Sequence, residues 1–304
     1  MYRSLGWILA FGLLIGAGSA GAQDPPVLDV TEELDFDSPE AWAMKYFASV
    51  SLLTGLGAVE ERRPGSVEVA FEATSVPHLD QEQRTVGFGG RKEEDLNRAP
   101  VYGRGRVTVG LPRRFALTFG WSPPVDIDGV EANLISLAIE KVLLQREPWA
   151  LGLRVFGQVG EAEGDLTCSE EDARFAPGSD QNLFGCEAPS EDEVQLDYYG
   201  LELTAYRQLQ SLGRARWHFG VTVQHLDLEF QVNARTFGFL DRTRQLADGE
   251  TFSVSTGATW AFGEKVHGGA ELFYSPLDVQ RLGETSASDD GVLNLRFMLR
   301  YRLR

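Results

Sequence analysis

Two tripeptides in the sequence have the residue types of an acid–base pair. Residues 78–80 and 225–227 both read His-Leu-Asp, so each places an imidazole two positions before a carboxylate. Alternate residues of a strand share one face, and a histidine held beside a carboxylate is a common general acid–base arrangement. In the second tripeptide, however, His225 and Asp227 continue the set of large apolar residues of their segment, not the opposite set.

Other motifs of catalysis or cofactor binding are missing from the sequence. It contains no GxSxG nucleophile turn, no HExxH zinc motif, no phosphate-binding glycine loop and no Cys/His spacing typical of a metal site. The sequence therefore predicts no assigned catalytic residue, no metal ligand and no cofactor, and an enzyme is not the favoured interpretation.

An acidic segment at about 161–193 holds both cysteines of the chain, Cys168 and Cys186. It contains eleven acidic residues and one base, Arg174. Such a loop could attract cations, or exclude anions, at the mouth of a pore. Alternatively, it could be a solvated loop that is only held in place and binds nothing, since no calcium-loop motif is present. If the chain is exported into oxidising conditions, a disulfide between the two cysteines is expected, with two free thiols as the alternative.

The first 22 residues predict export. Arg3 precedes a short apolar run, and the small residues 20–22 fit a signal-peptide cleavage site, with an uncleaved anchor as the alternative. No later apolar run reaches the roughly 18 residues of a transmembrane helix, which excludes a helix bundle in the membrane. The formal net charge of −17 argues against a nucleic-acid partner.

The elements that must position these residues are strands. From residue 65 to 304 the sequence falls into ten blocks with period-two alternation, joined by links that are alternately short and long. An even strand number with short turns on one rim and long loops on the other is typical of outer-membrane barrels. The blocks lie at about 66–77, 101–111, 114–123, 132–144, 148–161, 193–208, 215–231, 250–262, 265–277 and 291–304.

The two faces of these blocks differ in a way that favours a membrane. One face is almost purely aliphatic and aromatic, with aromatic residues at the block ends, whereas the other is rich in Gly, Ser, Thr and Ala with scattered charges. A soluble two-sheet sandwich can also alternate, but the aromatic ends and the link lengths favour an all-β, closed antiparallel transmembrane barrel. The charges predicted to face its lumen are Glu68, Glu72, Arg104, Arg106, Arg154, Glu202, Glu271, Arg296 and Arg300.

The last block shows the same division in its clearest form. Between Leu293 and Arg304 one alternate set is entirely apolar and the other carries four arginines. In a closed barrel this strand pairs with the first block, so Glu68 and Glu72 are the expected neighbours of its arginines. A narrow barrel leaves little room for water, and lumenal charges should therefore be paired or solvated in a thin column.

The segment 23–64 precedes the barrel domain, 65–304. Ser38 followed by Pro39 and Glu40 is typical of a helix start and predicts a helix at 39–53, in the periplasm or inside the lumen. A further strand is the alternative, although it would make the strand number odd. We expect the N-terminus in the periplasm and the long loops outside.

In architecture, the chain resembles bacterial outer-membrane β-barrel proteins, whose last strand alternates apolar positions as Phe297, Leu299 and Tyr301 do here. The resemblance implies a lipid environment, the barrel insertion machinery as a partner and a monomer. It favours a narrow channel, a barrel that binds or transports a small solute, or a structural barrel. Rim aspartates such as Asp126 and Asp128, together with the histidines, resemble the omptin protease arrangement, so a rim hydrolase is one alternative. Loop-mediated binding or adhesion is another.

Overall fold

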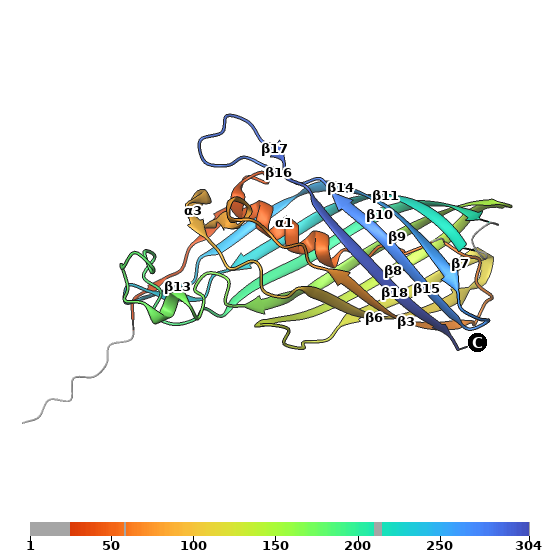
Figure 1. Cartoon of the computed structure of the whole chain (residues 1–304), viewed down its shortest axis with the longest axis horizontal. Coiled ribbons are helices and arrows are strands. Elements are labelled where there is room, and N and C mark those ends of the chain that lie inside the picture. The colour runs from red at the N-terminus through yellow and green to blue at the C-terminus, as the bar shows by residue number, and fades with distance from the viewer. Residues whose placement is uncertain (1–24, 58, 210–214, 304) are drawn as a thin grey trace, which may run out of the picture.

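Ten strands close into one antiparallel barrel in the part of the chain that the computed structural model describes, residues 25–57, 59–209 and 215–303 (Figure 1). Each strand pairs with its sequence neighbour in the barrel, and the last pairs back onto the first through Arg302 and Glu68. The predicted closed barrel is confirmed, while the predicted signal peptide, 1–22, lies outside the described residues. The barrel strands are β3 (Val67–Ser75), β6 (Val101–Leu111), β7 (Phe115–Ser122), β8 (Val130–Arg146), β9 (Trp149–Gly164), β10 (Asp192–Leu209), β11 (Ala215–Gln231), β14 (Arg244–Ala261), β15 (Val266–Ser275) and β18 (Val292–Arg302).

The outer surface of the barrel carries the apolar set. Phe71, Leu201 and Leu299 are each more than half exposed, whereas the alternate residues of the same strands are buried. A closed sheet satisfies every strand's backbone internally, which is what a lipid surrounding requires. No helix in the described ranges is long and apolar enough to cross a membrane.

The two rims differ in the length of their links. On the short-turn rim, β6 and β7 are joined by the 3-10 turn Pro112–Arg114, and β8 and β9 by residues 147–148; the link between β10 and β11 contains the undescribed residues 210–214. On the opposite rim, here called the long-loop rim, the links are 76–100, 123–129, 165–191, 232–243 and 276–291. They contain α2 (Gln81–Arg84), β4 (Thr85–Val86), α3 (Gly87–Gly90), β5 (Lys92–Glu93), the 3-10 turn Asp172–Arg174, β12 (Ala234–Thr236), β13 (Phe239–Asp241), β16 (Asp278–Val279) and β17 (Ser288–Asp289).

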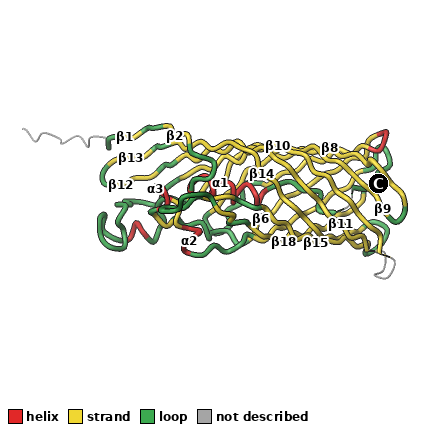
Figure 2. The backbone as a smooth tube through the Cα atoms, turned by 90° about the horizontal axis from the view of Figure 1, so that it is seen from above, coloured by secondary structure: helices red, strands yellow, loops and turns green. Residues whose placement is uncertain are grey.

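The N-terminal segment starts on the long-loop rim. There β1 (Val27–Leu28) pairs in parallel with β13, and β2 (Thr31–Glu33) pairs in parallel with the outer end of β14. The expectation that the N-terminus lies on the periplasmic, short-turn side is therefore wrong, because these pairings hold residues 25–38 among the long loops. From that rim the chain enters the barrel and reaches the start of β3 at the opposite end (Figures 1 and 2). We call the described residues 39–57 and 59–63, which lead from this rim through the lumen toward β3, the plug.

The plug begins with the helix α1 (Pro39–Ser51). The Ser38 hydroxyl accepts the amide of Ala41 over 3.3 Å, Pro39 occupies the first turn, and Glu40 adds an acid where the helix dipole favours one. Trp42 and Tyr46 are fully buried, and all but two of the thirteen helical residues are buried. A helix buried on every side belongs in an interior, and this one lies inside the barrel at the long-loop end (Figure 2).

Candidate functional site

The charged residues predicted for the lumen all lie inside the barrel. Each of the nine is less than a tenth exposed. Glu68 and Glu72 are neighbours of the last strand, as expected, with Glu68 opposite Arg302. Their direct ion pairs, however, are with other residues. Glu72 pairs with Arg106 of β6, and Glu68 pairs with Arg62 of the plug at 3.0 Å. Arg296 and Arg300 of β18 instead donate to the backbone of the plug, which occupies the lumen beside them.

The arginines hold the end of α1. Arg296 donates to the carbonyl oxygens of Ser49 and Leu52, each over 2.8 Å. Arg104 donates to the Ser51 carbonyl, and the Tyr198 hydroxyl donates to the same oxygen over 2.9 Å. The last carbonyls of a helix have no partner within the helix and carry partial negative charge, so fixed cations satisfy and stabilise them.

The chain below the helix is held in the same way. Arg106 donates to the carbonyl of Thr54 over 2.6 Å, and Arg300 donates to that of Gly55 over 3.0 Å. The Glu202 carboxylate accepts the Gly55 amide at 2.9 Å. A Cβ on Gly55 would lie 2.2 Å from the Arg154 guanidinium, so glycine alone permits this approach.

The remaining charges complete a buried network. Arg154 lies between Glu202, at 2.6 Å, and Glu140. Glu271 accepts the Thr54 hydroxyl over 2.9 Å and lies 3.0 Å from the His218 imidazole. Glu140 and His218 were not among the predicted site residues. Both stand on the lumenal face of their strands among small residues, and this pattern would have been enough to predict them. Buried charges need partners of this kind, and here the partners include the plug itself.

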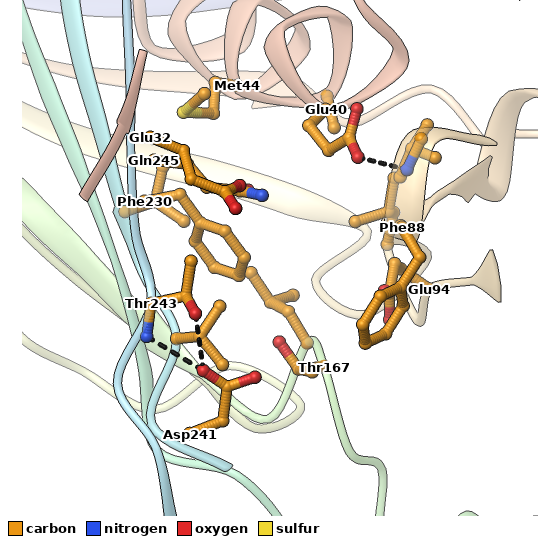
Figure 3. Close-up of a pocket in the computed structure, with 18 of the residues that line it drawn as sticks. Glu32, Glu40, Met44, Phe88, Glu94, Thr167, Phe230, Asp241, Thr243 and Gln245 are labelled. Atoms are coloured by element: carbon orange, nitrogen blue, oxygen red, sulfur yellow. Dashed lines mark hydrogen bonds between the residues drawn. The ribbon is translucent and has the colours of Figure 1, made fainter. Parts of the chain in front are cut away.

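Beside α1, a cavity of about 430 Å³ lies at the long-loop rim (Figure 3). Met44 and Phe47 of α1 form one side of it, and Phe230 and Val194 of the barrel wall form another. The loop 76–100 supplies Phe88. The walls are mainly apolar, and four acids, Glu32, Glu40, Glu94 and Asp241, line the cavity together with one base, Arg91.

Two of these acids accept hydrogen bonds from other residues of the protein. Glu40 accepts the amide of Gly89, and Asp241 accepts the amide and the hydroxyl of Thr243 over 2.9 and 2.7 Å. Glu94 differs, because burial raises the pKa of its carboxyl to about 8 even though the Lys92 ammonium beside it acts in the opposite direction. The negative character of the cavity therefore depends on pH near neutrality.

Comparisons with known proteins concern the barrel alone. No protein-family model matches the chain, and no curated protein matches its sequence. Among solved structures, it is similar to the outer membrane protease OmpT from Escherichia coli (13% identity, 79% of this chain and 94% of that one, TM-score 0.37). It is also similar to the translocator domain of the autotransporter NalP from Neisseria meningitidis (10%, 81% and 91%, 0.41) and to the attachment invasion locus protein Ail of Yersinia pestis (8%, 79% and 99%, 0.32). What the chain shares with them is the closed antiparallel β-barrel fold. At these identities the likeness says nothing of what this chain binds or does.

In this barrel the His-Leu-Asp tripeptides do not meet at a common site. His225 and Asp227 lie on the outward side of β11, where their cross-strand partners are Tyr199 and Asp197. His78 is exposed and lies 3.3 Å from the amide of Asn97. Neither tripeptide lines the rim cavity. Asp126 and Asp128 are exposed in the 123–129 loop, where Asp126 accepts the Gly129 amide over 2.8 Å. Within the described ranges, no group of three or more His, Cys, Asp or Glu residues could hold a metal ion.

The predicted disulfide of the barrel is confirmed. Cys168 and Cys186 are bonded and almost fully buried, while most acids of the surrounding loop are exposed. Cys186 also pairs through its backbone with Thr236, and this bridge ties the 165–191 loop to the neighbouring loop that carries β12. The disulfide and this bridge therefore fix the position of the acidic loop, which lies at the same rim as the cavity.

Proposed function

We propose that this outer-membrane barrel binds a small, largely apolar molecule at its long-loop rim and does not act as an open channel. The observation that carries the proposal is the cavity of about 430 Å³ between α1 and the long loops, at the end of a lumen that the plug occupies. This volume is in the usual range for small-molecule sites, which are mostly apolar with a few polar groups that orient the ligand.

The composition of the cavity supports one class of ligand. Met44, Phe47, Phe88 and Phe230 offer apolar and aromatic surface, whose burial against a ligand contributes about 25 cal/mol per Å². Glu32, Glu40 and Asp241 against the single Arg91 favour a neutral or cationic polar group on the ligand and disfavour an anionic one, and Glu94 adds to this negative charge only when it ionises at higher pH. We therefore expect a compact apolar molecule with an uncharged or amine end.

The plug supports the second half of the proposal. A solute crossing the lumen would have to displace a segment whose carbonyl and amide groups from Ser49 to Gly55 are bonded to buried charges. Breaking such contacts leaves charges buried without partners, at a cost of several kcal/mol. A plug held in this way is incompatible with a lumen that is open at rest.

A binding measurement tests the site. Dansylcadaverine, an apolar fluorophore with an amine, is titrated against the whole protein in nanodiscs, and dansylglycine serves as the anionic counterpart. Ala43 lines the cavity and is 8% exposed. We expect Ala43→Trp to fill the cavity and weaken dansylcadaverine binding by about tenfold or more, the scale on which an apolar pocket discriminates.

The control is Ala176→Trp, which adds the same side chain to an exposed position of the acidic loop. It should leave binding unchanged, and dansylglycine should bind more weakly than dansylcadaverine. Equal binding by the wild type and Ala43→Trp would show that the cavity is not the site, and the proposal would fail.

A further inference from the structure

The wall of the barrel has a gap beside β6. The ladder between β6 and β7 runs from Leu111 and Phe115 only as far as Gly105 and Trp121. Residues 101–104 of β6 continue beyond this point and are paired with β3 alone. Strand β7 ends at Ser122, and the chain then loops away through residues 123–129.

A second cavity, of about 240 Å³, lies at this gap. It is lined by Phe71 and Gly105, which belong to the outward set, and by Leu134 and Leu196, which face the lumen. Phe71 is 60% exposed, whereas Val50 of α1, at the inner end of the cavity, is 5% exposed. The cavity therefore connects the lipid-facing surface of the barrel with its interior.

The outer mouth of this cavity is open because two outward positions of β6 lack side chains. These are Gly103 and Gly105, and a Cβ on Gly105 would meet no atom closer than the Trp121 carbonyl oxygen, at 3.8 Å. On the lumenal side, the hydroxyls of Tyr102 and Ser122 are hydrogen-bonded over 2.5 Å. This side-chain contact joins the two strands where their backbone ladder has ended.

The two cavities are adjacent. Phe47, Leu96 and Leu166 line both of them. These three apolar side chains therefore lie between the cavity at the rim and the cavity at the wall. Apolar surface is thus continuous from the lipid-facing band, through the gap, to the proposed binding site.

We propose that the acyl chain of a membrane lipid enters the barrel through the gap between β6 and β7 and lies against Val50 and Phe47 of α1. The proposal rests on the proposed function, for which it supplies a substrate class and an access route from the bilayer. We infer an acyl chain because the cavity is continuous with the apolar outer surface of the barrel, which includes Phe71. At the mouth the gap faces the bilayer, where acyl chains are the abundant apolar groups. Inside, its lining is mainly apolar and matches such a chain.

Photo-crosslinking tests the route. The whole protein is placed in vesicles containing phosphatidylethanolamine with a diazirine at the end of one acyl chain, and labelled residues are mapped by mass spectrometry. The informative residue is Val50, because it lies inside the barrel and lines only the wall cavity of the two. We expect Val50 to be labelled in the wild type.

Gly105→Leu should close the mouth and lower labelling of Val50 several-fold, while Val107→Leu, at the next outward position outside the cavity, should leave it unchanged. Ala162→Leu fills the same cavity from β9 and should act as Gly105→Leu does, which covers the case in which one variant fails to fold. Absence of label on Val50 in the wild type, or equal label in wild type and both cavity-filling variants, overturns the lateral route.

The outcome is separable from that of the binding measurement. Dansylcadaverine binding that is lost in Ala43→Trp, together with no label on Val50, would leave the rim site intact and reject lipid access. Label on Val50 without any effect of Ala43→Trp on dansylcadaverine would reject the rim site and support the wall cavity as a lipid site of its own.

Discussion

Arg296 of the last strand donates to the carbonyl oxygen of Ser49 in the first helix over 2.8 Å, across 247 residues of sequence. The same guanidinium reaches Leu52, so the closing strand of the barrel also holds the end of the plug. The strand that closes the barrel thus also carries a fully buried side chain, 0% exposed, that holds the plug.

Arg296→Met should loosen the plug. The variant keeps a long side chain but leaves the last carbonyls of α1 without a donor, at about 1–3 kcal/mol for each unsatisfied group. We expect the wild type to show no steady conductance in planar bilayers and Arg296→Met to show frequent openings. The control is Arg207→Met, which removes an exposed arginine stacked on Trp149 near the short-turn rim. Identical, silent traces from both variants would count against the anchor.

The outward face should reject charge. Leu201 lies on β10 with 52% of its surface exposed, among other apolar outward residues. Leu201→Arg is expected to lower the free energy of unfolding by about 2–4 kcal/mol if the residue lies near the bilayer midplane. Asp180→Arg, in an exposed loop, should cost almost nothing. Urea titrations in lipid vesicles measure both, and an equal tolerance of the two changes would contradict the face assignment.

The strands and the site were predictable to different degrees. Period-two alternation predicts both which residues form strands and which of them face inward, because a closed wall has only two sides. It therefore located Arg296 and Glu202 in the lumen. It could not identify their partners, since Ser49 and Gly55 offer backbone groups that leave no trace in side-chain type. The sequence also did not predict that Thr31 lies at the long-loop rim. Strand β2 has only three residues, all exposed, and it is held by backbone pairing with β14, which side-chain types do not reveal.

The loop around Glu94 should respond to pH. Its folded pKa of about 8 lies above the ordinary value of 4.5, so the folded state favours the protonated carboxyl. The associated stability is fully present below about pH 4.5 and is lost as pH rises through about 8. Burial, together with the negative Asp192 and Asp172, favours the neutral carboxyl more strongly than the Lys92 ammonium favours its ionisation. Between pH 7 and 9, hydrogen exchange at 85–96 should therefore rise more in the wild type than in Glu94→Gln.

Glu94→Gln is the matched control because it keeps the shape of the side chain and cannot ionise. Comparing the two proteins at the same pH removes the base catalysis that speeds exchange everywhere. If the variant loosened as much as the wild type, the titration of another group would be responsible.

Reduction of the disulfide should act locally. Cys168 and Cys186 are separated by 18 positions, and closing a loop of this size contributes about 3 kcal/mol through the unfolded chain. The bond lies outside the barrel ladders, so its loss should expose 165–191 to protease without unfolding the barrel. Cys168→Ser should show faster cleavage there and an unchanged heat-dependent shift in gel mobility. A variant that failed to assemble would mean that the loop is needed for folding.

The direction in which the plug threads the barrel makes the N-terminal segment accessible from outside. Long loops face the exterior in outer-membrane barrels, and β1 and β2 pair among them. Asp29, between these strands, is exposed. Asp29→Cys should react with a membrane-impermeant maleimide on intact cells, as Asp180→Cys in the acidic loop should. Glu264→Cys, on the short-turn rim, should react only after lysis.

These three thiols separate the possible threadings, because the native cysteines are bonded to each other and leave one free thiol in each variant. If residues 25–38 were periplasmic, Asp29→Cys would behave like Glu264→Cys. If the whole barrel were inverted, Glu264→Cys alone would react on intact cells. Labelling of Asp29 together with Asp180 requires the chain to pass from the outer rim through the lumen to Val67, since β3 begins at the opposite end. That path is the one along which the lumenal arginines bind the plug.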